Sequence, residues 1–174
     1  MSVNDAHLAR IVATPDFDTN FAAVDIFVGA VGEPAALDAA QAWCAHGEPL
    51  QRAAGLDVLA VLAMRDDGCF HALLAAAEAV TPAHVHEDLR WSAAHALSSN
   101  PRPGALPVLL RFLQDPDGDV RWQVAVGLSE LATNFTDDDP AVQGLRVLAT
   151  DDDHDIRSKA ELGLRQVRGR FVPG

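Results

Sequence analysis

Asp88-Leu89-Arg90-Trp91 recurs almost unchanged as Asp119-Val120-Arg121-Trp122, 31 residues further along the chain. In both copies small or apolar residues then follow at spacings of four, which stack on one face of a helix. A fixed period of this size is typical of a solenoid, in which one helical unit is repeated and stacked. The two tetrapeptides therefore indicate the fold class before any other motif is considered.

The repeat extends over the chain as five copies. Each has an anchor, apolar in all but the first copy, with small or apolar residues four and eight positions later. The anchors are Thr19, Leu50, Leu89, Val120 and Ile156. The residues that follow them are Ala23 and Phe27, Ala54 and Val58, Ala93 and Leu97, Val124 and Leu128, and Ala160 and Leu164. We therefore expect anchored helices that start near residues 19, 50, 89, 120 and 156.

Each anchor is preceded by a residue suited to the start of a helix. Asp18, Asp88, Asp119 and Asp155 stand directly before four anchors, and Pro49 stands before the fifth. A carboxylate at this position can accept hydrogen bonds from the first backbone N–H groups and meets the positive end of the helix dipole. Proline suits the first turn because its missing N–H is not needed there.

Shorter apolar segments lie between the anchored helices, at residues 6–13, 34–45, 69–80, 104–113 and 140–149. Pro107 fits the fourth of them only if that helix starts late, near Leu106. Alanine and leucine dominate the chain and tyrosine is absent, which favours helices over strands. The sequence therefore predicts an all-α domain over residues 1–174, with ten helices in five antiparallel pairs.

Two segments resemble a known repeat family. Residues 117–128, with the pattern Asp-x-Asp-Val-Arg-x-x-x-Ala-x-Gly-Leu, resemble the second helix of HEAT and HEAT-like repeats, including those named after phycobilisome lyases. Residues 106–115 resemble the first helix and the turn of the same unit. The third, fourth and fifth copies match this pattern most fully, since Gln51 and Asn20 replace the arginine in the second and first.

The resemblance implies a right-handed superhelix of stacked helix pairs, with the arginine-bearing helices on the inner, concave surface and the terminal pairs as caps. It also implies a polar ladder, made by an Asp at the turn between helices and an Arg six residues later. Asp115 with Arg121, and Asp151 with Arg157, match that spacing. His84 stands at the Asp position of the third copy and departs from the pattern.

The position two residues after each anchor is the candidate binding surface. At 100° per residue it lies about 160° from the centre of the apolar face, so it should point away from the core. Aromatic residues and arginine, which are enriched at binding hot spots, fill four of the five places. The five residues are Phe21, Arg52, Trp91, Trp122 and Ser158. We predict partner binding by Trp91 and Trp122, with Phe21, Arg52 and the nearby His95 contributing. The alternative is that these rings pack between neighbouring repeats.

The formal net charge of −12 narrows the choice of partner. Such a surface repels phosphate backbones and anionic lipid, which argues against nucleic acid and membranes as ligands. A basic protein, or a small molecule in a neutral groove, suits this charge better, and solubility alone would also explain it. Two cysteines without metal-like spacing, no apolar run long enough for a membrane span and no signal peptide lead us to expect a cytoplasmic protein.

Motifs of catalysis are missing from the sequence. It has no Gly-x-Ser-x-Gly, no phosphate-binding glycine loop and no paired cysteines at zinc spacing. The cluster at residues 84–88 precedes a helix and is interpreted as solvated rather than metal-binding. Deoxyhypusine hydroxylase, an iron enzyme of HEAT-like repeats, uses several His-Glu pairs, and this chain has one, at residues 86–87. HEAT-like alkylpurine DNA glycosylases use a basic groove, which the net charge contradicts. We expect no cofactor and no metal.

The sequence therefore favours a non-catalytic scaffold or adaptor that binds a protein partner on its concave face. One alternative is an enzyme or enzyme subunit of the lyase-like type, holding a small ligand between Trp91 and Trp122. A closed apolar cavity at these rings and His95 would favour the enzyme, and a shallow open groove would favour the scaffold. A narrower alternative is an acidic antagonist of a basic toxin or nuclease. No feature of the sequence defines the oligomeric state.

Overall fold

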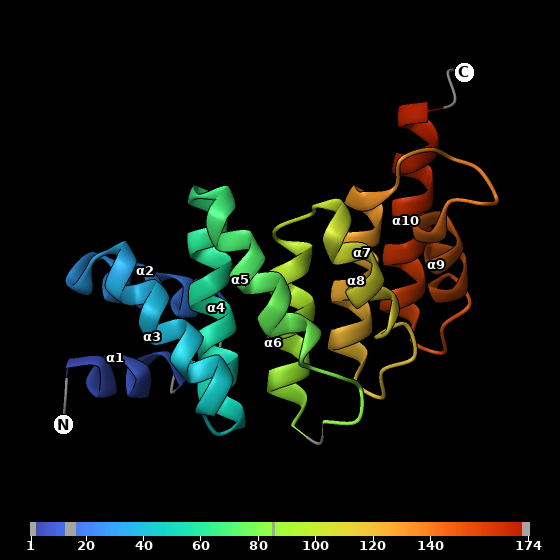
Figure 1. Cartoon of the computed structure of the whole chain (residues 1–174). Helices are drawn as coiled ribbons and strands as arrows, with labels where there is room; N and C mark the ends of the chain where they lie inside the picture. The colour runs from blue at the N-terminus through green and yellow to red at the C-terminus, as the bar shows by residue number, and fades with distance from the viewer. Residues whose placement is uncertain (1–2, 13–16, 85, 172–174) are drawn as a thin grey trace. The chain divides into compact units, whose positions relative to one another are not determined.

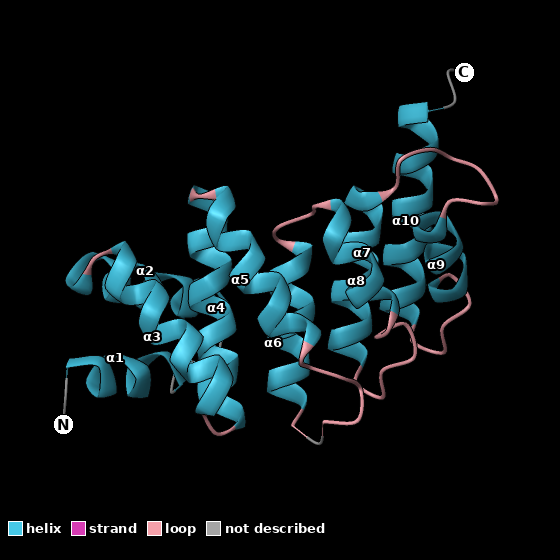
Figure 2. Ribbon diagram, in the orientation of Figure 1, coloured by secondary structure: helices cyan, strands magenta, loops and turns pink. Residues whose placement is uncertain are grey.

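The computed structural model describes residues 3–12, 17–84 and 86–171. Every regular element in these ranges is helical, as Figure 2 shows. The elements are α1 (Val3–Val12), α2 (Phe17–Val31), α3 (Glu33–His46), α4 (Pro49–Arg65), α5 (Asp67–Glu78), α6 (Glu87–Ser98), the 3-10 turn η1 (Pro103–Ala105), α7 (Leu106–Leu110), α8 (Gly118–Leu131), α9 (Pro140–Leu148) and α10 (His154–Phe171). The predicted all-α fold class is confirmed.

The helices begin close to where the repeat predicts them. α2, α4, α6, α8 and α10 start one or two residues before the five anchors, and the shorter helices fall in the segments between them. Pro107 has the expected effect: η1 covers residues 103–105, and α7 starts at Leu106. Pro49 is the first residue of α4, as its fixed φ favours.

Most residues of the stripe at spacings of four are buried in the core. Leu89, Val120 and Ile156 are at most 2% exposed, and their followers are buried except for the half-buried Leu164. Leu50 is a correction, because 38% of it is exposed. It is the second residue of α4, and the buried face of that helix begins one turn later. The side chain of Thr19 lies outside the described residues.

The acidic caps are displaced from the predicted positions. The Asp117 carboxylate accepts from the backbone N–H groups of Asp119 and Val120 at 2.8 and 3.1 Å. The Asp153 carboxylate caps α10 in the same way through the N–H of Asp155, at 2.8 Å. A capping residue has an extended backbone just before the first turn, which fits Asp117, whereas Asp119 already lies inside the helix.

Asp88 and Asp155 also lie inside the first turns of their helices, and α6 has no side-chain cap at its N-cap residue, His86. These carboxylates therefore meet the positive ends of the helix dipoles but do not cap them. The side chain of Asp18 lies outside the described residues. The prediction of Asp88, Asp119 and Asp155 as caps was wrong.

The chain forms two compact units, residues 1–80 and residues 81–174, called unit 1 and unit 2 here. Within unit 1, α4 packs against α2, α3 and α5, and α1 covers α2 and α4 (Figure 1). Within unit 2, α8 packs against α6 and α10, and α7 and α9 also pack on α8. The prediction of one domain over 1–174 stays a prediction. None of the described helices combines the length and apolarity of a bilayer-spanning segment.

Candidate functional site

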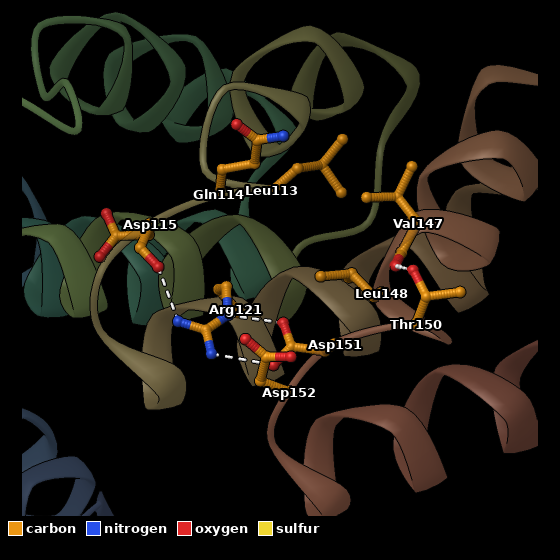
Figure 3. A pocket seen from close by; sticks show the side chains of 9 residues that line it. All are labelled: Leu113, Gln114, Asp115, Arg121, Val147, Leu148, Thr150, Asp151 and Asp152. Atoms are coloured by element: carbon orange, nitrogen blue, oxygen red, sulfur yellow. Dashed lines mark hydrogen bonds and ion pairs between the residues drawn. The ribbon is translucent and has the colours of Figure 1, made fainter.

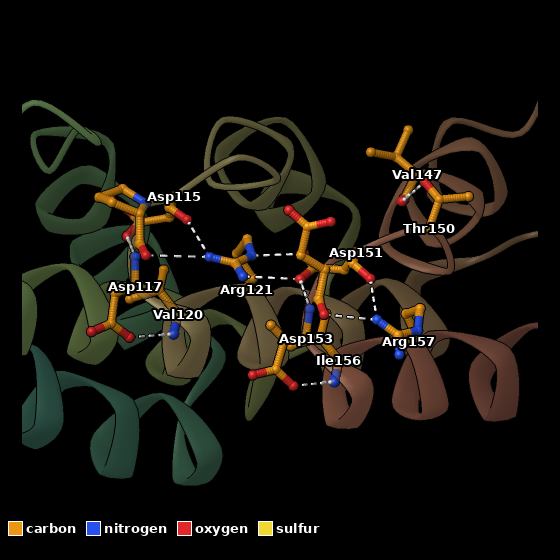
Figure 4. Close-up of polar contacts among 12 residues, drawn as sticks. Asp115, Asp117, Val120, Arg121, Val147, Thr150, Asp151, Asp153, Ile156 and Arg157 are labelled. Atoms are coloured by element: carbon orange, nitrogen blue, oxygen red, sulfur yellow. Dashed lines mark hydrogen bonds and ion pairs between the residues drawn. The ribbon is translucent and has the colours of Figure 1, made fainter.

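A ladder of arginine–carboxylate contacts crosses unit 2 at the turns before its anchored helices. The Arg90 Nε lies 2.9 Å from the Asp115 carboxylate, and both side chains are almost fully buried. One repeat further on, the Arg121 Nε and Nη2 donate to the two carboxylate oxygens of Asp151 at 2.7 and 2.9 Å (Figure 4). Each of these two arginines therefore pairs with the carboxylate of the following repeat.

The spacing of six residues is also present in the ladder, but it works through the backbone. Arg121 Nη1 donates to the carbonyl of Asp115 at 2.7 Å, and Arg157 Nη1 donates to the carbonyl of Asp151 at 2.6 Å. Arg90 Nη1 donates to the carbonyl of His84 at 2.6 Å. Because this contact needs only a carbonyl, His84 replaces an Asp at no cost to it. The six-residue spacing had implied that the Asp and Arg side chains pair within one copy. The side chains instead pair between neighbouring copies.

The ladder fixes how the turns of successive repeats meet. The hydrogen bond from Arg121 lowers the pKa of Asp151 below its usual value, against the opposing effect of burial. The Asp115 carboxylate also accepts from the N–H of Asp117 at 3.0 Å, which shapes the turn that leads into α8. The arginine and carboxylate groups of the ladder bind one another, so they stabilise the fold and are not directed at a ligand.

The aromatic positions behave differently, because they face away from the core. Trp122 is 39% exposed and Phe21 is 36% exposed, while Trp91 and Arg52 are half-buried. Phe21 and Arg52 belong to unit 1, whereas Trp91, His95 and Trp122 belong to unit 2. Unit 2 alone therefore brings together three of the five predicted binding residues.

Trp91 and His95 form a stacked pair on α6. Their ring centroids are 4.7 Å apart and the ring planes differ by 3°. Burial lowers the pKa of His95, while a side-chain hydrogen bond with Gln123 of α8 opposes that shift. A neutral imidazole consequently covers one part of the Trp91 ring at neutral pH.

Polar contacts join this pair to the helix that carries Trp122. The Ser98 hydroxyl lies 3.0 Å from the Gln123 Oε1 and 2.9 Å from the carbonyl of His95, so it can donate to either. Gln123 directly follows Trp122 in α8. The Trp91–His95 pair and Trp122 therefore lie on neighbouring, directly bonded helices.

Trp122 has a cation over its ring. The Lys159 Nζ, from α10, lies 5.3 Å from the ring centroid, which is within the range of a cation–π interaction. Lys159 was not among the binding residues predicted from the sequence. A signal was available, since Lys159 and Gln123 both stand three residues after an anchor, and that position contacts the preceding anchored helix.

Exposed carboxylates stand one turn before the aromatic positions. Asp88 precedes Trp91 by three residues and Asp119 precedes Trp122 by three, so each pair shares a helix face. The Asp88 side chain is 60% exposed and lies 3.4 Å from the His86 Nδ1. Asp119 is exposed as well. We call Trp91, Trp122, Asp88 and Asp119 the aromatic–acidic face of unit 2.

An open depression of about 410 Å³ lies beside the ladder (Figure 3). Its lining includes neither tryptophan. The residues that line it are Leu113, Gln114, Asp115, Arg121, Val147, Leu148, Thr150, Asp151 and Asp152. Its central charged groups, Arg121 and Asp151, already bind each other. Within the described ranges no cluster of His, Cys, Asp and Glu could hold a metal ion.

The family model for HEAT repeats matches residues 71–165, which is more than half of the chain. The protein therefore belongs to the HEAT repeat family, as the repeated tetrapeptides predicted. HEAT repeats generally mediate protein–protein interaction. A search of curated proteins finds no match to this chain.

Proposed function

We propose that the protein is a non-catalytic interaction module that binds another protein through the aromatic–acidic face of unit 2. The observation that carries the proposal is Trp122, a large aromatic side chain that is 39% exposed on a helix whose other face is buried. Tryptophan is enriched at binding hot spots, and the neighbouring helix α6 carries a second tryptophan, Trp91. Phe21 and Arg52 of unit 1 are further predicted contacts.

The partner is a basic protein. Its cationic side chains would meet Asp88 and Asp119, and the net charge of −12 would steer its approach. The same charge disfavours nucleic acid. The position of Lys159 over Trp122 supports this choice, because that ring already has a cation beside it.

Absence of catalysis is part of the proposal. His95 is stacked on Trp91, and Arg121 and Asp151 in the depression beside the ladder are paired with each other. Neither arrangement leaves an evident nucleophile or general base directed at a ligand. We also propose a cytoplasmic location, which the two free thiols, Cys44 and Cys69, support.

The test is a comparative capture experiment from the native host. Wild-type protein, Trp122→Ala and Val147→Ala are used as baits, and the bound proteins are identified by mass spectrometry. Val147 is the matched control, because it is 48% exposed on α9, which carries no residue of the aromatic–acidic face. We expect a basic protein that binds wild type and Val147→Ala and is lost with Trp122→Ala.

Thermal unfolding of the three baits separates binding from stability. Loss of the partner with an unchanged melting temperature supports a surface role for Trp122. If Trp122→Ala keeps every partner of the wild type and melts well below Val147→Ala, the ring is a packing residue and the proposed site is wrong.

A further inference from the structure

We propose that Lys159 is an internal occupant of the Trp122 site, and that a cationic side chain of the partner displaces it. This inference rests on the proposed function, since it assigns the chemistry by which the same face recognises a basic protein. The partner segment is therefore one that inserts a lysine or arginine between the Trp122 ring and the Asp119 carboxylate.

Lys159 has no other polar role in the described part of the chain. Its ammonium lies over the Trp122 ring, and among the described residues no carboxylate forms an ion pair with it. The chain carries a net charge of −12, so acidic groups are abundant and the ring contact is not explained by a shortage of them. The Trp122 ring is thus the group in unit 2 with which the Lys159 ammonium interacts.

The Lys159–Trp122 contact is weak enough to be exchanged. An exposed cation–π contact contributes roughly 0.5–1 kcal/mol, and Trp122 is still 39% exposed with the lysine beside it. A partner cation would gain the same ring and, in addition, the exposed Asp119 carboxylate one turn away. Exchange therefore replaces one contact with two.

The neighbouring Trp91 site differs in the residue that covers it. There the stacked group is His95, from the same helix as the tryptophan, and the residue equivalent to Lys159 is the neutral Gln123, held by Ser98 at 3.0 Å. The His95 imidazole is held by its stack on Trp91 and by its hydrogen bond with Gln123. It is therefore harder to move than the Lys159 side chain. The two sites are consequently unequal, with Trp122 open to exchange and Trp91 prestacked.

Removing Lys159 should strengthen binding of a basic ligand. The probe is an octalysine peptide, with octaglutamate as the reversed-charge control, measured by titration calorimetry on the full chain. The salt is kept at about 150 mM, where charges more than about 8 Å apart are largely screened. We expect Lys159→Gln to tighten octalysine binding about twofold to fivefold, which corresponds to the removed cation–π contact. Lys159→Arg keeps a cation over the ring and should bind as the wild type does.

Arg168→Gln is the matched control. Arg168 is exposed on the same helix, α10, so its loss changes the net charge by the same amount without touching Trp122. We expect its effect on octalysine binding to be smaller than about 1.5-fold, since an exposed distant charge is largely screened.

Two failures are distinguishable. If octalysine binds the wild type and Lys159→Gln behaves like Arg168→Gln, general electrostatics explains the binding, and the displacement of Lys159 is wrong while the proposed function stands. If octalysine binds none of the four proteins better than octaglutamate does, the basic partner itself is wrong. Melting temperatures within about 2 °C of one another confirm that the variants are folded.

Discussion

Two arginine–carboxylate pairs of unit 2 have the same chemistry in opposite surroundings. Arg90 and Asp115 are 4% and 1% exposed, whereas the side chains of Arg165 and Glu161 are 67% and 56% exposed and 3.7 Å apart. Removing one partner of a buried pair leaves an uncompensated charge, which costs about 3–5 kcal/mol. An exposed pair contributes about 0.5 kcal/mol or less.

We therefore predict that Asp115→Ala lowers the free energy of unfolding by about 3 kcal/mol or more, and that Glu161→Ala lowers it by less than about 0.5 kcal/mol. Urea unfolding followed by circular dichroism measures both. A difference between the two variants below about 1 kcal/mol would contradict the role of the ladder as a buried structural element.

His95 makes stability depend on pH in a defined direction. Burial lowers its pKa in the folded protein below the usual histidine value of about 6.5. As the pH falls through 6.5, the unfolded chain takes up the proton first, so this group causes a loss of stability on acidification. We predict that the wild type loses more unfolding free energy between about pH 7 and pH 5.5 than His95→Gln does.

His154→Gln is the control for this titration, because the His154 side chain is 80% exposed. Its loss of stability over the same pH range should match the wild type. Equal pH dependence in all three proteins would show that His95 stays solvated and can take up a proton freely, which would remove the prestacked state of Trp91.

At the level of single residues, the sequence predicted the orientation of the aromatic positions but not what contacts them. Helical periodicity places Trp91 and Trp122 away from the core, because the angle per residue is fixed. The Lys159 ammonium reaches Trp122 from the next anchored helix, and that contact depends on how the two helices cross. Spacing within one helix carries no information on such a crossing.

Among the elements, the anchored helices of unit 2 cross at a recurrent pair of small residues. A Cβ added to Gly127 would lie 3.2 Å from the Ser98 Cα and 2.6 Å from the Leu109 Cδ1. In the next crossing, a Cβ on Gly163 would lie 3.2 Å from the Leu145 Cδ2 and would also meet Ser129. At Gly127 the backbone of α6 leaves little room for a Cβ, and at Gly163 the Ser129 and Leu145 side chains fill that space.

We predict that Gly127→Ala destabilises the protein by about 1–3 kcal/mol, since overpacking outweighs the roughly 1 kcal/mol that alanine gains in helix propensity. Gly169→Ala is the matched control on α10, where an added Cβ has nothing within 4 Å, and it should stabilise by up to about 1 kcal/mol. Thermal unfolding compares the signs. A stabilising Gly127→Ala would mean that α6 and α8 separate easily.

The elements themselves were largely predictable, and their caps were not. Helix starts near Val120 and Ile156 follow from the apolar stripe, which tertiary burial reinforces. The capping residues, Asp117 and Asp153, are found only from the backbone conformation, because several aspartates compete in each turn. The exposed Leu50 shows the same limit, since an apolar residue in a first turn need not reach the core.

For the whole molecule, the repulsion from the net charge responds to salt, whereas the buried Arg90–Asp115 pair hardly does. A charge of −12 repels itself in the compact state, and added salt screens this repulsion. The Arg90–Asp115 pair is nearly inaccessible to solvent, so salt screens it little. The same salt weakens the attraction of a basic partner for the aromatic–acidic face.

We therefore predict that raising the salt from about 20 mM to 300 mM, which shortens the screening length several-fold, raises the melting temperature and weakens octalysine binding in the same protein. Calorimetric melting and titration of one preparation measure both quantities. Both are measured on one preparation because a salt-induced loss of fold would lower the melting temperature and the octalysine affinity together. Parallel loss would show that exposed ion pairs such as Arg65–Asp25 dominate stability. A higher melting temperature with weaker octalysine binding would indicate that buried contacts stabilise the fold. It would also indicate that the acidic surface contributes to recognition and not to stability.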